Sequence, residues 1–333
     1  MAPFCPMIQL REQRSQKPPR PDFSSSSVLH QFQCPKPRPR PPTIPTNFIQ
    51  NVVGPLNKFK EARITADGLT KFRVTLTPMD FETGKVDSRC RKLLNLSCTR
   101  EIETFTRKVQ PWIGYDGLTC FDNFLPERYI TDNPHPRNYH RTAQEFATIL
   151  NVWATNSMYQ TFKASLLGQT SWNEHSDAPA ARWLGVPATD DYIWRPNFVY
   201  HNFKMKSSDC EPRAADPEKP HAMCYVVDST PFLEDGSLRT SELKTIILIA
   251  VYNHVKPEYN HLDSFGVTAI SFWDRDVRIV QGLVNFRTWD VDVRLTKVQR
   301  FHTGFRGADG SIDVRFLTLL AYNSADVLPL LKY

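Results

Sequence analysis

Several marks of membrane, secreted and nucleic-acid-binding proteins are missing from this 333-residue sequence. It contains no run of 18 apolar residues, so we expect no membrane-spanning segment. No basic residues precede its first short apolar stretch, which Pro3 and Pro6 interrupt, and this argues against a signal peptide. Its seven cysteines form no closely spaced framework, as in proteins with reduced thiols. These absences favour an intracellular protein, cytoplasmic or nuclear, with no membrane partner.

Most of the net positive charge lies in the N-terminal segment. The chain has a net charge of +6, but residues 1–46 hold seven Lys or Arg and only two acidic residues. The rest of the chain is therefore nearly neutral and offers little counterion release to a phosphate backbone. We expect no specific binding of nucleic acid.

Residues 1–46 are rich in Pro and Arg and predict a disordered tail. Their acid-poor composition is compatible with a transit peptide, but eleven prolines oppose an amphipathic presequence helix. Lys36, Pro39 and Pro42 have the spacing of a polyproline II ligand, so they are candidates for binding a protein partner. A plain disordered linker explains the same residues.

Residues 47–333 predict one globular α+β domain, with a subdivision near residue 190 as the alternative. Helices and strands occur in blocks, which favours a mostly antiparallel sheet with flanking helices. A hairpin is expected over 63–77, because an Asp-Gly pair suits a tight turn. Apolar periodicity and capping residues predict helices over about 49–59, 99–110, 143–167, 241–254 and 311–322.

A short motif occurs twice in the C-terminal third, at residues 273–278 and again at 289–294. Both copies predict strands of a meander. In the second copy, Asp290 and Asp292 lie on one face of the strand, where two carboxylates can share a cation. Alternation with apolar residues explains them without a metal, as cross-strand charge pairs on a half-buried strand.

One pair of segments matches the metal-binding hairpin of PD-(D/E)XK nucleases in outline. Asp228 ends a predicted strand, and Glu242 and Lys244 follow as an E-x-K pair. Such carboxylates converge on a divalent metal while the lysine polarises water or phosphate. Here a polar segment precedes the E-x-K, and the Thr-Ser pair before Glu242 is a good helix N-cap. We therefore predict a helix, keep a strand and the nuclease as alternatives, and expect the three side chains to point to separate surfaces.

The zinc-binding residue types His201, Cys210, His221 and Cys224 occur within a short span. Cys224 belongs to a predicted strand, where residues three apart face opposite sides, so it does not pair with His221. The glycine-rich segment 304–310 lacks the lysine and the hydroxyl residue of a phosphate-binding loop. We expect neither a metal nor a cofactor.

Residues 192–203 form an unusually aromatic stretch. Tyr192, Trp194, Tyr200 and His201 are candidates for lining a small-molecule pocket. Packing in the core is the alternative, and it is favoured because large aromatic residues are mostly buried.

The stretches TSWNEHSDAPAARWLGV, DDYIWRPNFVYHNF and YVVDSTPFLEDGSLRTSE resemble uncharacterised proteins of filamentous fungi, over about residues 47–325. No activity is known for those proteins, so the resemblance implies no site. Our main hypothesis is a non-catalytic binding or accessory protein whose partner or metabolite is not specified. The alternatives are a nuclease that uses Asp228, Glu242 and Lys244, and a metabolic enzyme with an aromatic pocket around 192–203.

Overall fold

The computed structural model describes residues 46–87, 90–109, 134–155, 165–174, 193–204, 215–306 and 311–330. All of them belong to one compact unit, Pro41–Tyr333. The predicted tail up to residue 45, with its polyproline residues, and the region around residue 190 lie outside the described residues. No helix in the described part of the chain combines the length and the apolar character needed to cross a membrane.

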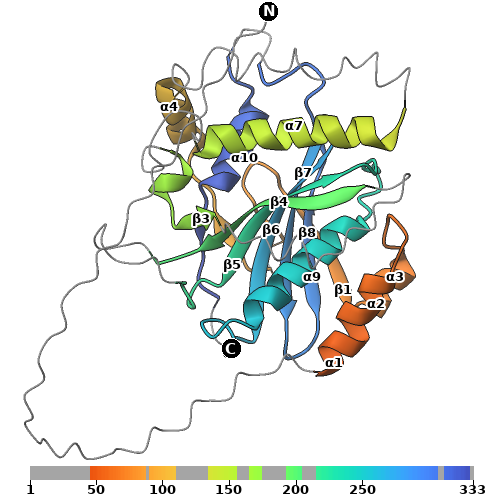
Figure 1. The fold of residues 1–333 in the computed structure, drawn as a ribbon. Coiled ribbons are helices and arrows are strands. Elements are labelled where there is room, and N and C mark those ends of the chain that lie inside the picture. Colours follow the sequence, from red (N-terminus) through yellow and green to blue (C-terminus); the bar gives the residue numbers. More distant parts are fainter. Residues whose placement is uncertain are drawn as a thin grey trace, which may run out of the picture. The chain divides into compact units, whose positions relative to one another are not determined.

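A mixed sheet of eight strands forms the centre of the described unit (Figure 1). Its strand order is β1-β8-β7-β6-β5-β4-β3, and β9 pairs with β7. Two neighbouring pairs are parallel, β1 with β8 and β5 with β6, and the others are antiparallel. The predicted α+β class with a mostly antiparallel sheet is therefore confirmed. The strands are β1 Val74–Met79, β3 Trp172–Glu174, β4 Trp194–Asn202, β5 His221–Asp228, β6 Ser264–Trp273, β7 Asp276–Asn285, β8 Val291–Thr296 and β9 Gln299–Arg300.

Helices cover both faces of this sheet, and Figure 1 shows α7 and α9 on opposite sides. One face packs against α9, which joins the parallel strands β5 and β6, and against the short N-terminal helices. The other face packs against α4, α7 and α10, near a small sheet of β2 and β10. The other elements among the described residues are α1 Thr46–Phe48, a π-helix Ile49–Val53, α2 Gly54–Lys58, α3 Ala66–Lys71, β2 Leu94–Asn95, α4 Thr99–Val109, α7 Pro136–Thr155, a 3-10 turn Leu167–Gln169, α9 Thr240–His254, α10 Val314–Asn323 and β10 Asp326–Val327.

Strand β5 shows why most positions of the central strands are apolar. Met223 and Tyr225 pack into the core beneath α7 and α10, whereas Cys224 and Val226 pack into the core beneath α9. Successive side chains of a strand point to opposite faces, so a sheet covered on both faces favours apolar residues at consecutive positions. All eight residues of β5 are buried.

The predicted hairpin over 63–77 is wrong. Residues 66–71 form the helix α3, and the Thr65 side chain accepts a hydrogen bond of 3.2 Å from the backbone N–H of Gly68. This N-cap satisfies a first-turn donor, so the Asp-Gly pair lies inside a helix instead of a turn. Strand β1 then pairs in parallel with β8, more than 200 residues later, and not with a neighbouring strand.

Three predicted helices are found with shifted ends. Helix α7 begins at Pro136, a residue that suits the first helical turn. Thr142, which directly precedes the predicted start of this helix, lies inside it and donates to the carbonyl of Asn138 at 3.2 Å. Helix α10 begins at Val314, with Asp313 as its N-cap. The helix predicted over 99–110 is confirmed as α4.

The repeated motif marks the two turns of the predicted meander. In the first copy, Trp273 ends β6 and Asp274 adopts a φ of 48° in the turn to β7. In the second copy, Trp289 has a φ of 65° just before β8. The meander β6-β7-β8 is confirmed, although each copy contains a turn residue as well as the start of a strand.

Candidate functional site

A buried network of charged residues joins the end of β5, the start of α9 and the strand β7. Arg239 is the N-cap of α9, and Glu242 lies in the first turn. The carboxylate of Glu242 accepts hydrogen bonds of 2.9 Å from the backbone N–H of Arg239 and from Nε of Arg278. The Glu242 side chain is completely enclosed, and each of the two arginine side chains is 1% exposed. The first turn of α9 is therefore tied to the sheet by a fully buried ion pair.

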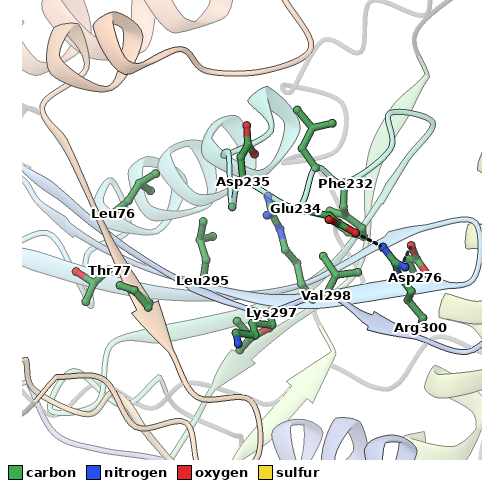
Figure 2. A pocket seen from close by; sticks show the side chains of 15 residues that line it. Leu76, Thr77, Phe232, Glu234, Asp235, Asp276, Leu295, Lys297, Val298 and Arg300 are labelled. Atoms are coloured by element: carbon green, nitrogen blue, oxygen red, sulfur yellow. Dashed lines mark hydrogen bonds and ion pairs between the residues drawn. The ribbon is translucent and has the colours of Figure 1, made fainter.

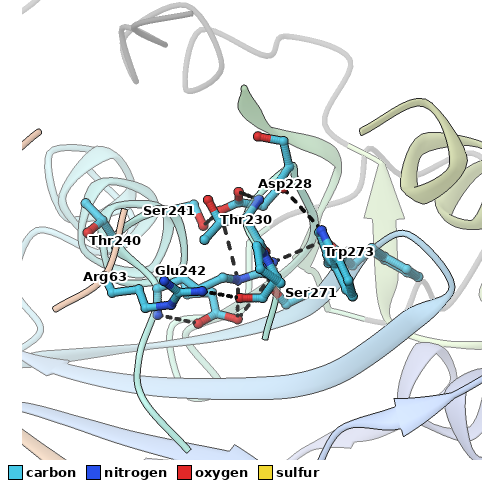
Figure 3. Close-up of polar contacts among 12 residues, drawn as sticks. Arg63, Asp228, Thr230, Thr240, Ser241, Glu242, Ser271 and Trp273 are labelled. Atoms are coloured by element: carbon cyan, nitrogen blue, oxygen red, sulfur yellow. Dashed lines mark hydrogen bonds and ion pairs between the residues drawn. The ribbon is translucent and has the colours of Figure 1, made fainter. Parts of the chain in front are cut away.

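Asp228 belongs to the same network, as Figure 3 shows. Its Oδ1 accepts a hydrogen bond of 2.7 Å from the backbone N–H of Thr230, and its Oδ2 accepts one from the Ser241 hydroxyl. Nε of Arg239 lies 3.9 Å from that Oδ2. Arg239 also donates to the carbonyl of Thr230 at 2.9 Å and to the hydroxyl of Ser271. The guanidinium of Arg239 is thus the cation between the two carboxylates.

The two carboxylates of the network differ in pKa. Burial favours a neutral Glu242, but the charges of Arg278 and Arg239 and the hydrogen bonds that they donate outweigh it and lower its pKa to about 2. Burial raises the pKa of Asp228, and the more distant charge of Arg239 and the hydrogen bonds of Ser241 and Thr230 do not offset it. The pKa values of Glu242 and Asp228 shift in opposite directions because the guanidinium groups lie closer to Glu242 than to Asp228.

The structure places the three residues of the nuclease hypothesis in two locations. Asp228 and Glu242 converge on Arg239, whereas the Lys244 ammonium donates to the carbonyl of Phe59 at 2.8 Å. The predicted helix over 241–254 is confirmed as α9, so the E-x-K pair lies on a helix. The expected separation of Asp228 from Glu242 is wrong, because both reach the same guanidinium. Sequence reasoning missed Arg278, which binds Glu242 from 36 residues away.

The residues suggested as zinc ligands are not arranged as a zinc site in the described part of the chain. His221 Nε2 lies 2.8 Å from the hydroxyl of Thr268, and burial lowers the pKa of this histidine to about 3. Cys224 is a buried free thiol, and Cys210 lies outside the described residues. Among the residues that the structure describes, no group of three His, Cys, Asp or Glu is arranged to hold a metal.

Asp290 and Asp292, the two carboxylates of the second motif copy, form charge pairs, but only the pair of Asp290 joins neighbouring strand segments as predicted. Asp290 pairs with Arg73 at 2.7 Å on the exposed edge of the sheet. Asp292 pairs with Arg294 at 2.8 Å on the same strand. Both carboxylates therefore already have cationic partners.

The aromatic stretch forms part of the interior. Trp194 and Tyr200 are completely buried, and His201 is 3% exposed. Tyr200 donates through its hydroxyl to Asn151 of α7, which fixes that ring in the core. The core interpretation is confirmed for these described residues, and Tyr192 lies outside the described part of the chain.

A cleft of about 530 Å³ opens beside the buried network (Figure 2). Its lining comes from β1, from the loop that follows β5, and from β7, β8 and β9. Arg278 belongs to both the network and this lining, so the cleft is on the face of the sheet that carries α9. The lining residues are Leu76, Thr77, Pro78, Phe232, Leu233, Glu234, Asp235, Gly236, Asp276, Arg278, Leu295, Thr296, Lys297, Val298 and Arg300.

Phe232 forms the wall between the cleft and the network. Its ring centre lies 4.0 Å from the guanidinium carbon of Arg239 and 4.9 Å from that of Arg278. Such cation–π contacts favour one position of the ring. The buried network therefore helps to hold the loop that shapes the cleft.

Asp276 is the nearly enclosed carboxylate of the cleft, and its side chain is 8% exposed. Nε of Arg300 lies 4.0 Å from its Oδ2, and Nε2 of His302 lies 3.4 Å from its Oδ1. Oδ1 accepts no hydrogen bond from the described residues. Burial raises the pKa of Asp276 to about 6, because His302 and Arg300 compensate only in part and Asp274 adds a like charge.

The rim of the cleft is exposed and charged. Figure 2 shows Arg300 between Glu234 and Asp276. The pair between Arg300 and Glu234 spans 3.2 Å, and its side chains are 58% and 89% exposed. Water screens a pair of this kind, so it contributes little to stability.

A second cleft of about 750 Å³ shares Lys297 with the first and includes the start of α10. Its most enclosed charges are already paired, because Nε of Arg315 donates to Oδ1 of Asp313 at 3.0 Å. Asp80 accepts hydrogen bonds from the backbone N–H and the hydroxyl of Thr83, which lower its pKa. This cleft therefore offers fewer unoccupied acceptors to a ligand.

No family model, curated protein or solved structure matches the chain. What the site does must therefore follow from the chemistry of its own residues.

Proposed function

We propose that this protein is an intracellular, non-catalytic binding protein that takes a small molecule into the cleft beside α9. One observation carries the proposal: a cleft with apolar walls contains an enclosed carboxylate, Asp276, with one oxygen that accepts no hydrogen bond from the described residues. Ligand sites usually combine apolar walls with a few such polar groups. The odd number of cysteines supports the intracellular location.

The size and position of the cleft also support the proposal. Its 530 Å³ falls within the range of roughly 300–1,000 Å³ that is usual for small-molecule sites. Its loop, residues 231–236, follows the carboxyl end of β5, and Asp276 pairs with Trp273 at the carboxyl end of β6. In α/β sheets, ligands bind at the carboxyl ends of parallel strands.

A metabolic enzyme is the second candidate, and the pKa of Asp276 favours it. A carboxylate with a pKa of about 6 near an imidazole is suited to accept a proton at neutral pH. The two functions differ in the fate of a bound compound. A binding protein releases it unchanged, whereas an enzyme converts it, and mass spectrometry after incubation separates these outcomes.

The proposal is tested by titrating the full chain with Nile red, an uncharged apolar dye that fluoresces in apolar surroundings. Leu233→Asp places a charge on the wall of the cleft at a residue that is already 39% exposed. We expect it to weaken dye binding about tenfold, because one apolar contact is replaced by a charge that must lose water.

Val314→Asp is the matched control, since Val314 is 60% exposed and lines the second cleft. It should leave the affinity for Nile red unchanged. Absence of dye binding, or an equal loss in both variants, would overturn the assignment of the site.

A further inference from the structure

The charged groups of the cleft differ in how far they are already paired. Arg278 donates to both carboxylate oxygens of Glu242 and, at 2.9 Å, to the carbonyl of Ser237. Asp235 accepts a hydrogen bond of 2.8 Å from the backbone N–H of Ser237. Arg278 and Glu242 neutralise each other, and Asp235 is exposed, so water screens its charge.

Asp276 is enclosed but less well satisfied. The guanidinium of Arg300 lies 4.0 Å from its Oδ2, which is beyond hydrogen-bond distance, and Arg300 also pairs with Glu234. His302 lies 3.4 Å from Oδ1 without a hydrogen bond to it. A carboxylate removed from water gains most from a donor that carries positive charge, because charge-assisted hydrogen bonds are the stronger kind.

The apolar walls of the cleft indicate what the uncharged part of a ligand should be. Leu76, Leu295 and Val298 form apolar lining on the side of the sheet, and Phe232 and Leu233 do so on the side of the loop. The Phe232 ring already contacts two guanidinium groups, and Asp276 is the enclosed carboxylate in the lining that can bind a ligand cation. The cleft is therefore suited to a molecule with an apolar body and a single cationic end.

We infer that the cleft selects small molecules that join an apolar body to a protonated amine, with the amine paired to the carboxylate of Asp276. This inference rests on the proposed binding function and adds the class of ligand. A ligand carboxylate at the same place would meet a like charge in a partly enclosed site, where repulsion is poorly screened. The selectivity therefore comes from attraction of the amine and from rejection of the anion.

The test uses three probes with one phenyl body and different ends: 2-phenylethylamine, 2-phenylethanol and 3-phenylpropionate. Each displaces Nile red from the full chain at neutral pH, with affinities expected to be about millimolar for such small molecules. We expect the amine to bind at least about tenfold more tightly than the carboxylate, with the alcohol between them.

Asp276→Asn keeps the shape of the side chain and removes its charge, so it should abolish the preference for the amine. Asp290→Asn is the matched control, because it makes the same change at an exposed carboxylate outside the cleft, and it should keep the preference. A carboxylate that binds as tightly as the amine in the wild-type protein overturns the inference, and this comparison needs no variant. Preference for the amine that survives in Asp276→Asn overturns the role of Asp276. Absence of Nile red binding instead overturns the proposed function itself.

Discussion

Glu242 and Asp276 are both carboxylates enclosed on the α9 face of the sheet, but their surroundings shift their acidity in opposite directions. The pKa of Glu242 is lowered to about 2, although burial alone would raise it. The pKa of Asp276 is raised to about 6. Glu242 accepts hydrogen bonds from two enclosed guanidinium groups, whereas Asp276 has one exposed guanidinium at 4.0 Å and one imidazole.

This difference separates a carboxylate that holds the fold from one that is available to a ligand. The network around Glu242 joins α9 to β7 and has no room for another cation, because its hydrogen bonds already come from Arg239 and Arg278. The site around Asp276 borders a cleft and retains an oxygen without a hydrogen bond in the described structure. The number of close donors, and not burial alone, distinguishes the two sites.

The largest expected effect on stability is that of Glu242→Ala. This substitution leaves two buried guanidinium groups without their shared carboxylate, which should lower the free energy of unfolding by roughly 3–5 kcal/mol. An exposed glutamate in the first turn of a helix would contribute only about 0.3–1 kcal/mol through the helix dipole, but Glu242 is completely enclosed. Urea denaturation followed by circular dichroism measures the difference.

Glu234→Ala serves as the control for that measurement, because Glu234 pairs with Arg300 on the exposed rim. It should change the free energy of unfolding by no more than about 0.5 kcal/mol. Similar losses for the two variants would show that the network around Glu242 does not hold the fold.

The next largest expected effect is the loss of stability in acid that protonation of Glu242 causes. The folded pKa of Glu242 lies below its ordinary value of 4.5, so its contribution is fully present above pH 4.5 and is lost as the pH falls toward about 2. At 1.36 kcal/mol per pKa unit, this contribution is about 3 kcal/mol. The stability difference between wild type and Glu242→Gln should therefore shrink on acidification. A difference that stays constant from pH 6 to pH 3 would contradict the low pKa.

Ionisation of Asp276 should change the stability with pH in the opposite direction to ionisation of Glu242. Its folded pKa lies above its ordinary value of 3.8, so the protein loses stability as the pH rises from about 3.8 through about 6. Asp276→Asn removes this loss and should be more stable than wild type by about 1–3 kcal/mol at pH 7. The two proteins should converge below pH 4 when thermal unfolding is followed across that range. A variant that is much less stable at pH 7 would assign Asp276 a structural role like that of Glu242.

Arg300→Met is expected to change stability only slightly. The Arg300 side chain is 58% exposed, so its loss should change the free energy of unfolding by less than about 1 kcal/mol. The pKa of Asp276 should rise further, because the guanidinium near Oδ2 partly offsets the effect of burial. NMR titration of the Asp276 carboxyl carbon measures this shift, and an unchanged pKa would exclude Arg300 as a partner of Asp276.

Local sequence patterns accounted for much of the fold. A polar segment followed by an apolar run predicted α9, although its N-cap is Arg239 and not the Thr-Ser pair, and the repeated motif predicted the meander β6-β7-β8. These features depend on residues close together in the chain. The pairing of β1 with β8 was missed, because it joins segments more than 200 residues apart and α3 had been interpreted as a turn.

The candidate site depended far more on the tertiary structure. From the sequence, Asp228 and Glu242 were suspected as a pair, and the pair does converge. What lies between them is a guanidinium, and no local pattern marks Arg239 and Arg278 as its source. The cleft of Asp276 was not predicted either, because its walls come from four separate segments of the chain.

The sequence by itself therefore determined the elements and the apolar faces that bury them, since capping, periodicity and strand alternation act over a few residues. Only the tertiary structure decided which charges meet. The register of β7 against β6 and the angle of α9 place Arg278 on Glu242 and leave Asp276 at the edge of a cleft. A carboxylate's pKa depends on the distances to all surrounding charges, and those distances are set when the whole chain packs.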